Sequence, residues 1–465
     1  MSLLKRAVWL AASPGFNVLN HLGANSPWFS SPNINHISTE VPAGCAVDQA
    51  VYIVRHGSRY PDPGAYEEWE ALYKKFQSAK YKAHGSLEFL PDWQPVVKHP
   101  EEEMSMVSLG GYYELYTFGV ELRWRYPNFY TDNDPFFLWA NDYPRTIDSA
   151  RLFARGYMGP NATLDGTIYV VNADVPSSVG NSLATSDSCP TFHDTSGGAN
   201  VTAWADIYLP PITKRLNKLI EGNLTLVDAD VSLFPYLCGF ETQITGSVSP
   251  WCDILSDDEI LQYEYAQDMR YYYGTGPGAG KNMTVQFPLL RGIVEQLQSG
   301  PGVARAKTAT NISTKLPPLI VAFTHDNQIN ELASILGIFD RQKPLDPKKL
   351  EDRLYVSSNI TPMRGTLAFE RLNCSASKQY EASKDKPYVR IRLNDAVYPI
   401  PSCHSGPGQS CSVSQYAEYV SKKWQSYGSF ASVCNISAAT VATSDTGAVT
   451  FFNDLTLPFL STVQP

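Results

Sequence analysis

Residues 51–61 read Val51-Tyr52-Ile53-Val54-Arg55-His56-Gly57-Ser58-Arg59-Tyr60-Pro61, an apolar run followed at once by two arginines around one histidine. The apolar half predicts a buried strand, and the glycine and proline after it predict a turn. Guanidinium groups match pairs of phosphate oxygens, and a histidine between them can attack phosphorus. A solvated surface turn is the alternative interpretation. The strand–turn context favours a phosphate site made by Arg55, His56 and Arg59.

Two later strands are also predicted to end in polar residues. Residues 136–140 form a short apolar strand, followed by Arg145 and a helix. Residues 319–324 form another, followed by His325, Asp326 and a helix. Strands that alternate with helices predict an α/β fold with a mainly parallel central sheet and helices on both faces. Because ligands of such sheets bind beyond the carboxyl ends of the strands, the three strand ends predict a single site.

The chain has 465 residues, enough for two domains or for one domain with a large insertion. Few strand signals occur between residues 158 and 300, which predicts a smaller, mostly α-helical inserted domain. The residues before the first strand are rich in Asn, Ser, Pro and Gly, and they predict an extended arm that lies on its own domain or joins a homo-oligomer. The predicted units are the arm (1–44), the α/β domain in two parts (45–157 and 301–440), the inserted domain (158–300) and a C-terminal tail (441–465). Helices are predicted over 65–80, 109–125, 146–157, 212–221, 257–273, 284–298 and 328–336, and a further strand over 388–393.

The charge balance limits the classes of partner. The net charge is −9, from 37 Lys and Arg against 46 Asp and Glu. An acidic exterior argues against nucleic acid and against an anionic membrane surface. No apolar run reaches the length of a membrane span. A local arginine cluster can still attract a small anion, so small-molecule phosphate esters remain the expected partners.

Cysteines and glycosylation signals indicate an oxidising compartment. The chain has eight cysteines without any C-x-x-C pair, which favours disulfides over zinc. Eight Asn-x-Ser/Thr sites add to the expectation of a secreted glycoprotein. Lys5 and Arg6 precede only a short apolar piece at residues 7–12, so residues 1–13 predict a degenerate signal or an incomplete chain start. The acceptor residues are Asn161, Asn200, Asn223, Asn282, Asn311, Asn359, Asn373 and Asn435.

Other motifs fail on spacing. The glycine-rich residues 274–281 resemble a P-loop, but Thr275 stands where the first glycine is needed, so a flexible turn is predicted. The three tyrosines Tyr271–Tyr273 before it are predicted to pack in the core. The sequence has no Gly-x-Ser-x-Gly elbow and no His-x-x-x-His pair, so we expect neither that type of hydrolase nor a metal site.

With these motifs, the chain resembles the histidine acid phosphatases, and within them the secreted fungal phytases and low-pH acid phosphatases. The resemblance rests on residues 55–61, Arg145 and the pair His325-Asp326, and it covers roughly residues 15 to 440. It implies an α/β domain with an inserted helical domain, a cleft between them, and no metal or cofactor. Sequence alone allows 105 pairings of eight cysteines. The pairing that the resemblance implies is Cys45–Cys374, Cys189–Cys434, Cys238–Cys252 and Cys403–Cys411.

The resemblance also implies a role for each candidate residue. His56 would attack phosphorus to form a phosphohistidine, and Asp326 would protonate the departing oxygen. Neighbouring arginines lower the pKa of a histidine, so the nucleophile stays neutral in acid, and we expect an acidic pH optimum. The phosphate itself would be held by Arg55, Arg59, Arg145 and His325.

The choice of substrate depends on the residues around the phosphate. Relatives tuned to phytate (myo-inositol hexakisphosphate) tend to carry lysines there, but residues 62–68 contain none and Tyr265–Asp268 is neutral to acidic. Glu68 and Gln267 are the candidate rim residues. This pattern predicts broad hydrolysis of phosphate monoesters, or of phytate only at very low pH. Two alternatives stay open: a catalytically inactive secreted binding protein of the same fold, and a phosphomutase of the same superfamily, which secretion and the His-Asp pair disfavour.

Overall fold

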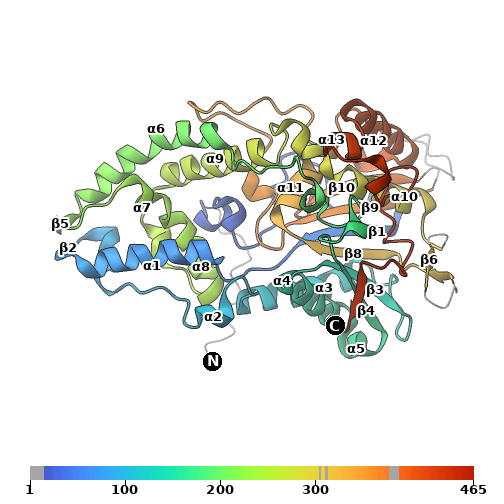
Figure 1. The fold of residues 1–465 in the computed structure, drawn as a ribbon, viewed down its shortest axis with the longest axis horizontal. Helices are drawn as coiled ribbons and strands as arrows, with labels where there is room; N and C mark the ends of the chain where they lie inside the picture. Colours follow the sequence, from blue (N-terminus) through green and yellow to red (C-terminus); the bar gives the residue numbers. More distant parts are fainter. Residues whose placement is uncertain (1–14, 303–304, 309–312, 376–386) are drawn as a thin grey trace.

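The first predicted strand lies at the centre of the molecule (Figure 1). In the computed structural model, β1 spans Cys45–Arg55 and its last seven residues are buried. Val51 and Ile53 belong to one hydrophobic core, whereas Tyr52 and Val54 belong to another. Because side chains alternate across a strand, β1 must be covered on both faces, as its continuous apolar sequence predicts. The structure describes residues 15–302, 305–308, 313–375 and 387–465.

β1 is part of a mixed sheet. It pairs in parallel with β8 (Leu319–Thr324) and antiparallel with β9 (Thr366–Cys374). The strand order is β11-β10-β9-β1-β8-β3-β4-β13, with β12 beside β10. Among the described pairs, only β1–β8, β8–β3 and β3–β4 are parallel. The other bounds are β3 (Phe136–Asn141), β4 (Gly166–Val171), β10 (Tyr388–Leu393), β11 (Ala396–Tyr398), β12 (Cys411–Ser412) and β13 (Leu460–Val463).

The prediction of a mainly parallel sheet is therefore wrong for one half of the sheet. β10 and β11 are joined by only Asn394 and Asp395, and both residues have positive φ. Such a two-residue turn makes a hairpin, whereas a parallel pair would need a long crossover. The chain is an α/β protein with a mixed sheet.

Helices cover both faces of the sheet, as predicted (Figure 1). α3 (Leu109–Arg125) and α4 (Pro144–Met158) supply Phe118 and Phe153 to the core that contains Tyr52. On the other face, α10 (Phe287–Ser299), α11 (Asp326–Ile335) and α12 (Val413–Tyr427) contribute to the core that contains Val51.

A group of helices forms a second part beside the sheet (Figure 1). The prediction assigned the first helix to the α/β part, but Trp69 of α1 packs edge-on against Tyr236 and Phe240 of α8. A small β2–β5 sheet also joins the segment after α1 to the segment after α6. The helical part therefore includes residues on both sides of α3 and α4. Its elements are α1 (Pro63–Ser78), β2 (Tyr81–Ala83), α6 (Gly198–Asn217), β5 (Ile220–Gly222), α7 (Asp228–Ser232), α8 (Phe234–Thr245) and α9 (Asp257–Gly274).

The boundaries at residues 158 and 441 also differ from the prediction. β4 lies inside the predicted insertion, yet it extends the central sheet beside β3. The predicted tail contributes β13, which pairs antiparallel with β4, and the fully buried Phe451 and Phe452. β13 has only Leu460 and Val463 as apolar residues, so it does not stand out as a strand, whereas β4 carries the apolar run Ile168–Val171 and was simply not recognised. The remaining short elements are α2 (Pro100–Glu103), α5 (Ala162–Asp165), β6 (Arg305–Lys307), β7 (Ser313–Lys315) and α13 (Phe430–Val433).

The arm before β1 lies on its own chain. Leu19, Leu22 and Ala24 are buried within two short 3-10 turns, Val18–Asn20 and Gly23–Asn25. The predicted signal at residues 1–13 and the acceptor Asn311 lie outside the described residues. None of the described helices combines the length and the apolar composition needed to cross a membrane.

Four disulfides join the cysteines. The pairs are Cys45–Cys374, Cys189–Cys434, Cys238–Cys252 and Cys403–Cys411, the same pairs that the resemblance implies. The first pair joins opposite residues of β1 and β9.

Candidate active site

The end of β1 is fixed by the strands on both of its sides. The amide of Arg55 donates to the carbonyl of Gly365 at 2.7 Å, and the amide of His56 donates to that of Thr324 at 3.0 Å. The carbonyl of His56 accepts from the amide of Arg364 at 2.9 Å. A Cβ at Gly57 would lie 2.6 Å from Leu115 Cδ1 and 3.2 Å from the carbonyl oxygen of Gly111, so a side chain at this turn would push against helix α3.

The His56 ring is buried and its tautomer is determined. Its side chain contacts the backbone of Gly57, with Nδ1 at 3.0 Å from the carbonyl oxygen. A carbonyl only accepts, so Nδ1 carries the proton and Nε2 keeps its lone pair. Burial, and then the charges of Arg55, Arg145 and Arg59, hold the pKa of His56 well below its ordinary value. The imidazole therefore stays neutral in acid.

Backbone carbonyls hold Arg55, and a carboxylate holds Arg59. Arg55 Nη1 donates to the carbonyls of Ala24 and Thr361, each at 2.6 Å. Arg59 Nη2 pairs with Asp62 at 2.7 Å, and its guanidinium lies 5.5 Å from the centre of the Phe240 ring. These contacts fix both guanidinium groups in place.

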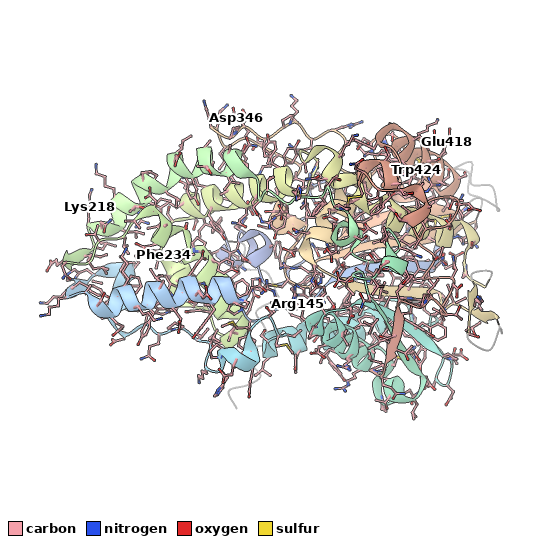
Figure 2. The ribbon with its side chains drawn as sticks, viewed as in Figure 1. Arg145, Lys218, Phe234, Asp346, Glu418 and Trp424 are labelled. Atoms are coloured by element: carbon pink, nitrogen blue, oxygen red, sulfur yellow. A yellow bond between two sulfur atoms is a disulfide. The ribbon has the colours of Figure 1, made fainter. Side chains whose placement is uncertain are left out.

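Arg145 and His325 join the same cluster. The Arg145 guanidinium lies 5.3 Å from the Tyr143 ring, which meets His325 edge-on at 4.8 Å. The His325 ring is 5.6 Å from that of His56. Burial, and then the charge of Arg145, lower the pKa of His325 to about 3. Figure 2 shows Arg145 where the helical part meets the sheet part.

Asp326 begins α11 next to the arginines. One of its carboxylate oxygens, Oδ2, is 3.8 Å from Arg55 Nη2 and accepts a hydrogen bond from the hydroxyl of Tyr271. Burial alone would raise its pKa, but Arg55, Arg270 and the Tyr271 hydroxyl outweigh it and hold the pKa of Asp326 well below the usual range. Asp326 is therefore ionised in the free protein.

Several buried N–H and ring nitrogen atoms in this cluster have no hydrogen-bond partner within the protein. They are the Nε atoms of Arg55, Arg59 and Arg145, together with both ring nitrogens of His325. Buried polar groups are normally satisfied, so unpaired donors on three cations indicate an anion-binding site. The six predicted residues thus meet at one place. They include the neutral imidazole of His56, whose Nε2 keeps its lone pair, and the carboxyl group of Asp326.

The residues predicted to lie around the phosphate site are not grouped with these six. Glu68 is exposed on α1, and Gln267 is half-buried and packs against Gly23 of the arm. Tyr265 and Asp268, also expected near the rim, are fully buried, and Asp268 pairs with Arg353. The segment was misread because its acidic residue serves a buried ion pair.

A family model decides between the histidine phosphatases and other phosphate-binding proteins. The model "Histidine phosphatase superfamily (branch 2)" matches residues 46–394. The chain belongs to this superfamily branch.

Relatives within the histidine phosphatase superfamily include proteins named acid phosphatases and proteins named phytases. An acid phosphatase of Komagataella pastoris is 30% identical over 86% of this chain and 83% of its own length. A phytase of Candida albicans is 29% identical over 88% of this chain and 85% of its own. Among solved structures, the phytase from D. castellii superposes with a TM-score of 0.81 at 25% identity, covering 95% of this chain and 91% of that one.

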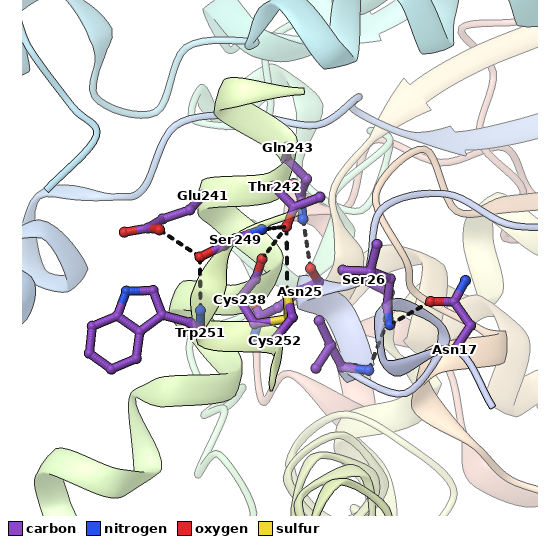
Figure 3. Close-up of a disulfide and its surroundings, with 12 residues drawn as sticks. Asn17, Asn25, Ser26, Cys238, Glu241, Thr242, Gln243, Ser249, Trp251 and Cys252 are labelled. Atoms are coloured by element: carbon purple, nitrogen blue, oxygen red, sulfur yellow. Dashed lines mark hydrogen bonds between the residues drawn. A yellow bond between two sulfur atoms is a disulfide. The ribbon is translucent and has the colours of Figure 1, made fainter. Parts of the chain in front are cut away.

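Sequence reasoning missed how the arm completes this histidine phosphatase site. The carbonyl of Ala24 holds Arg55, and the next residues are held in turn by the helical part. The carbonyl of Asn25 accepts from Gln243 Nε2 at 2.6 Å, beside the Cys238–Cys252 disulfide (Figure 3). These contacts use backbone atoms of ordinary residues, which leave no signal in a sequence.

Proposed function

We propose that this protein is a secreted acid phosphatase that hydrolyses phosphate monoesters through a phosphohistidine at His56. The observation that carries the proposal is a neutral, buried imidazole whose Nε2 is free among three arginines, with a carboxyl group alongside. Membership of the superfamily supports phosphate chemistry, and four disulfides fit an extracellular protein.

The reaction has two steps. In the first, His56 Nε2 forms a bond to phosphorus, the bond from phosphorus to the ester oxygen breaks, and Asp326 gives its proton to that oxygen. In the second, water attacks phosphorus, the P–N bond breaks, and Asp326 regains a proton from the water. Arg55, Arg59, Arg145 and His325 neutralise the phosphoryl oxygens throughout.

The ionised state of Asp326 in the free protein requires a source for that proton. A bound phosphate group brings negative charge to the arginines that lower the pKa of Asp326, so binding raises that pKa again. In acid, a monoester arrives as its monoanion and carries one proton into the site. We therefore propose that Asp326 becomes protonated when the substrate binds in acid.

The range of substrates is proposed to be broad. The site begins beside Asp62, and Glu67 and Glu68 are exposed on α1, so the charges near it do not favour a hexaphosphate at neutral pH. Phytate itself loses negative charge as the pH falls, which lessens this repulsion. Hydrolysis of phytate relative to p-nitrophenyl phosphate should rise as the pH is lowered, which a pH series of both substrates measures.

The test of the proposal is phosphate release in the presence of a chelator. Purified protein should release phosphate from p-nitrophenyl phosphate in acid, and vanadate, a phosphate analogue, should block it. His56→Ala should lower kcat by at least about 10³-fold while the fold survives. His84→Ala, which removes a half-exposed histidine of the helical part, is the matched control and should leave kcat unchanged.

The inactive binding protein is the alternative that this experiment separates. A binder would show a phosphate-dependent rise in Tm without any release of phosphate. A phosphomutase would instead transfer the phosphoryl group to a second hydroxyl of its substrate, so free phosphate would not accumulate.

A further inference from the structure

We propose that Tyr271 is the positioning residue of the proton donor: its hydroxyl holds one carboxylate oxygen of Asp326 so that the other faces the leaving group. The proposal rests on the proposed function. The hydroxyl of Tyr271, on α9, donates to Asp326 Oδ2, on α11. Arg55 Nη2 lies 3.8 Å from the same oxygen. With Oδ2 engaged by both groups, Oδ1 is the oxygen left to carry the proton to the ester oxygen.

The Tyr271 ring is buried, with Arg270 against it. Only 3% of Tyr271 is exposed, and the Arg270 guanidinium lies 4.2 Å from the centre of its ring. Arg270 pairs with Asp194 at 3.0 Å, and Asp194 also accepts from Asn327 Nδ2, next to Asp326, at 3.3 Å. Asp194 thereby ties the residue before Tyr271 to the residue after Asp326.

A second tie joins the two helices one turn away. Asn330 of α11 donates from Nδ2 to the Tyr271 carbonyl at 3.0 Å and to Thr275 Oγ1 at 2.8 Å. The side-chain oxygen of Asn330, Oδ1, accepts from the Tyr355 hydroxyl at 2.5 Å. Two polar ties on either side of the Tyr271–Asp326 contact leave that contact little freedom, which is what a proton donor in a fixed orientation requires.

Charged and titratable groups from several elements face the carboxyl group. They are Arg55 and His56 at the end of β1, Arg145 on α4, Arg270 on α9 and the adjacent His325. Around Tyr271 itself, the neighbours are Arg55, Arg270 and the hydroxyls of Tyr263 and Tyr355. Burial, and then the charge of Asp326, raise the pKa of Tyr271, so its hydroxyl keeps its proton and stays a donor. Because it stabilises the carboxylate form, removing it must raise the pKa of Asp326.

Tyr271→Phe tests the proposal, with Tyr273→Phe as the matched control. Tyr273 lies on the same helix and its hydroxyl also makes one hydrogen bond, at 2.6 Å to the carbonyl of Leu345, away from the site. We expect Tyr271→Phe to lower kcat about tenfold for an alkyl phosphate but less than about threefold for p-nitrophenyl phosphate, with KM within about twofold. The alkaline limb of kcat against pH should move up by about one unit. Tyr273→Phe should change none of these.

A double variant separates positioning from general damage. In the Asp326→Asn background, Tyr271→Phe should cost less than about a further twofold, because the carboxyl group it positions is gone. The proposal would be overturned if Tyr271→Phe lowered kcat equally for both esters and left the alkaline limb of kcat unmoved. It would also be overturned if Tyr271→Phe lowered kcat as much in the Asp326→Asn background as in the wild type.

Two further arms keep the outcome interpretable. Should Tyr271→Phe not fold, Asp194→Asn, which releases Arg270 from under the ring, should give a smaller loss with the same dependence on the leaving group. A loss that ignores the leaving group would contradict the proposal. Wild-type protein that releases no phosphate from either ester would instead reject the proposed function itself.

Discussion

One hydrogen bond decides which nitrogen of His56 can react. The Gly57 carbonyl takes the Nδ1 proton and leaves Nε2 free. Burial, and then the same arginines that would hold a phosphate, keep the ring neutral, so in the proposed mechanism one set of side chains serves both phosphate binding and the nucleophile. The cost of this arrangement is two buried histidines, His56 and His325, whose lowered pKa values keep them from taking up a proton in mild acid.

That cost predicts a pH-dependent stability of the free protein. The folded pKa of His325 is about 3, below the ordinary 6.5 of an unfolded chain. Its contribution to stability is present above pH 6.5 and is lost as the pH falls, because the unfolded state binds the proton first. At pH 4 the loss from this group is roughly 3 kcal/mol. The Tm of the His325→Gln variant should therefore fall less between pH 7 and pH 4 than the Tm of the wild type. An equal or larger fall would contradict the low pKa of His325.

Site residues that stand together in the sequence are easier to predict than those that meet only in the fold. Arg55, His56 and Arg59 stand together in one turn, so the sequence predicts their neighbourhood directly. Tyr271 was predicted to pack in the core, and it is buried, but its hydroxyl also reaches Asp326 across 55 positions of the chain. A pattern of apolar residues indicates that a side chain is buried and does not indicate which polar atom it meets.

At the scale of elements, two helices bring Arg145 to the site by packing unusually closely. A Cβ on Gly156 of α4 would overlap the carbonyl oxygen of Tyr116 on α3, and one on Gly119 of α3 would overlap the carbonyl oxygen of Phe153 on α4. Two glycines, one on each helix, thus set the distance between α3, which packs over Gly57, and α4, which carries Arg145.

Gly156→Ala tests this contact. Alanine favours a helix interior over glycine by up to about 1 kcal/mol, but backbone atoms of the facing helix cannot give way, so overpacking should win with a net loss of about 1–3 kcal/mol. Gly64→Ala in the first turn of α1, where nothing lies within 4 Å, should change stability by less than about 0.5 kcal/mol. Urea unfolding of both variants makes the comparison. Equal stabilities would show that α3 and α4 can separate freely.

Three strands that are continuous apolar runs were predicted, whereas a strand that contains a buried charge was missed. β1, β3 and β8 are continuous apolar runs, and the structure has all three. β9 was missed because it contains Glu370, which is 1% exposed and pairs with Arg390 at 2.5 Å on the neighbouring strand. The charge interrupts the apolar pattern of β9, whereas β10 was predicted as a strand over 388–393 despite Arg390. Only the fold reveals that the two charges meet.

The whole molecule is held by disulfides that span very different lengths of chain. Cys45–Cys374 closes a sequence separation of 329 residues between β1 and β9, whereas Cys403–Cys411 closes one of 8. In the chain-entropy description, the longer loop restrains the unfolded state more. The sequence alone left this pairing open, and the resemblance supplied it.

Removing each pair should therefore have unequal effects. Replacing Cys45 and Cys374 by alanine should cost about 5 kcal/mol of unfolding free energy, and replacing Cys403 and Cys411 about 2 kcal/mol. Chemical denaturation of the two double variants gives both values. A larger loss from the shorter loop would mean that native contacts, and not the constraint on the unfolded chain, determine the stabilisation.

The central claim is a covalent bond between His56 and the phosphoryl group. Protein mixed with a phosphate monoester in acid and quenched in alkali within a turnover, where a phosphohistidine survives, should yield one phosphorylated peptide by mass spectrometry. The account predicts that the phosphoryl group sits on His56 and that His56→Ala carries none. Steady release of phosphate with no labelled His56, or with the label on another residue, would contradict it.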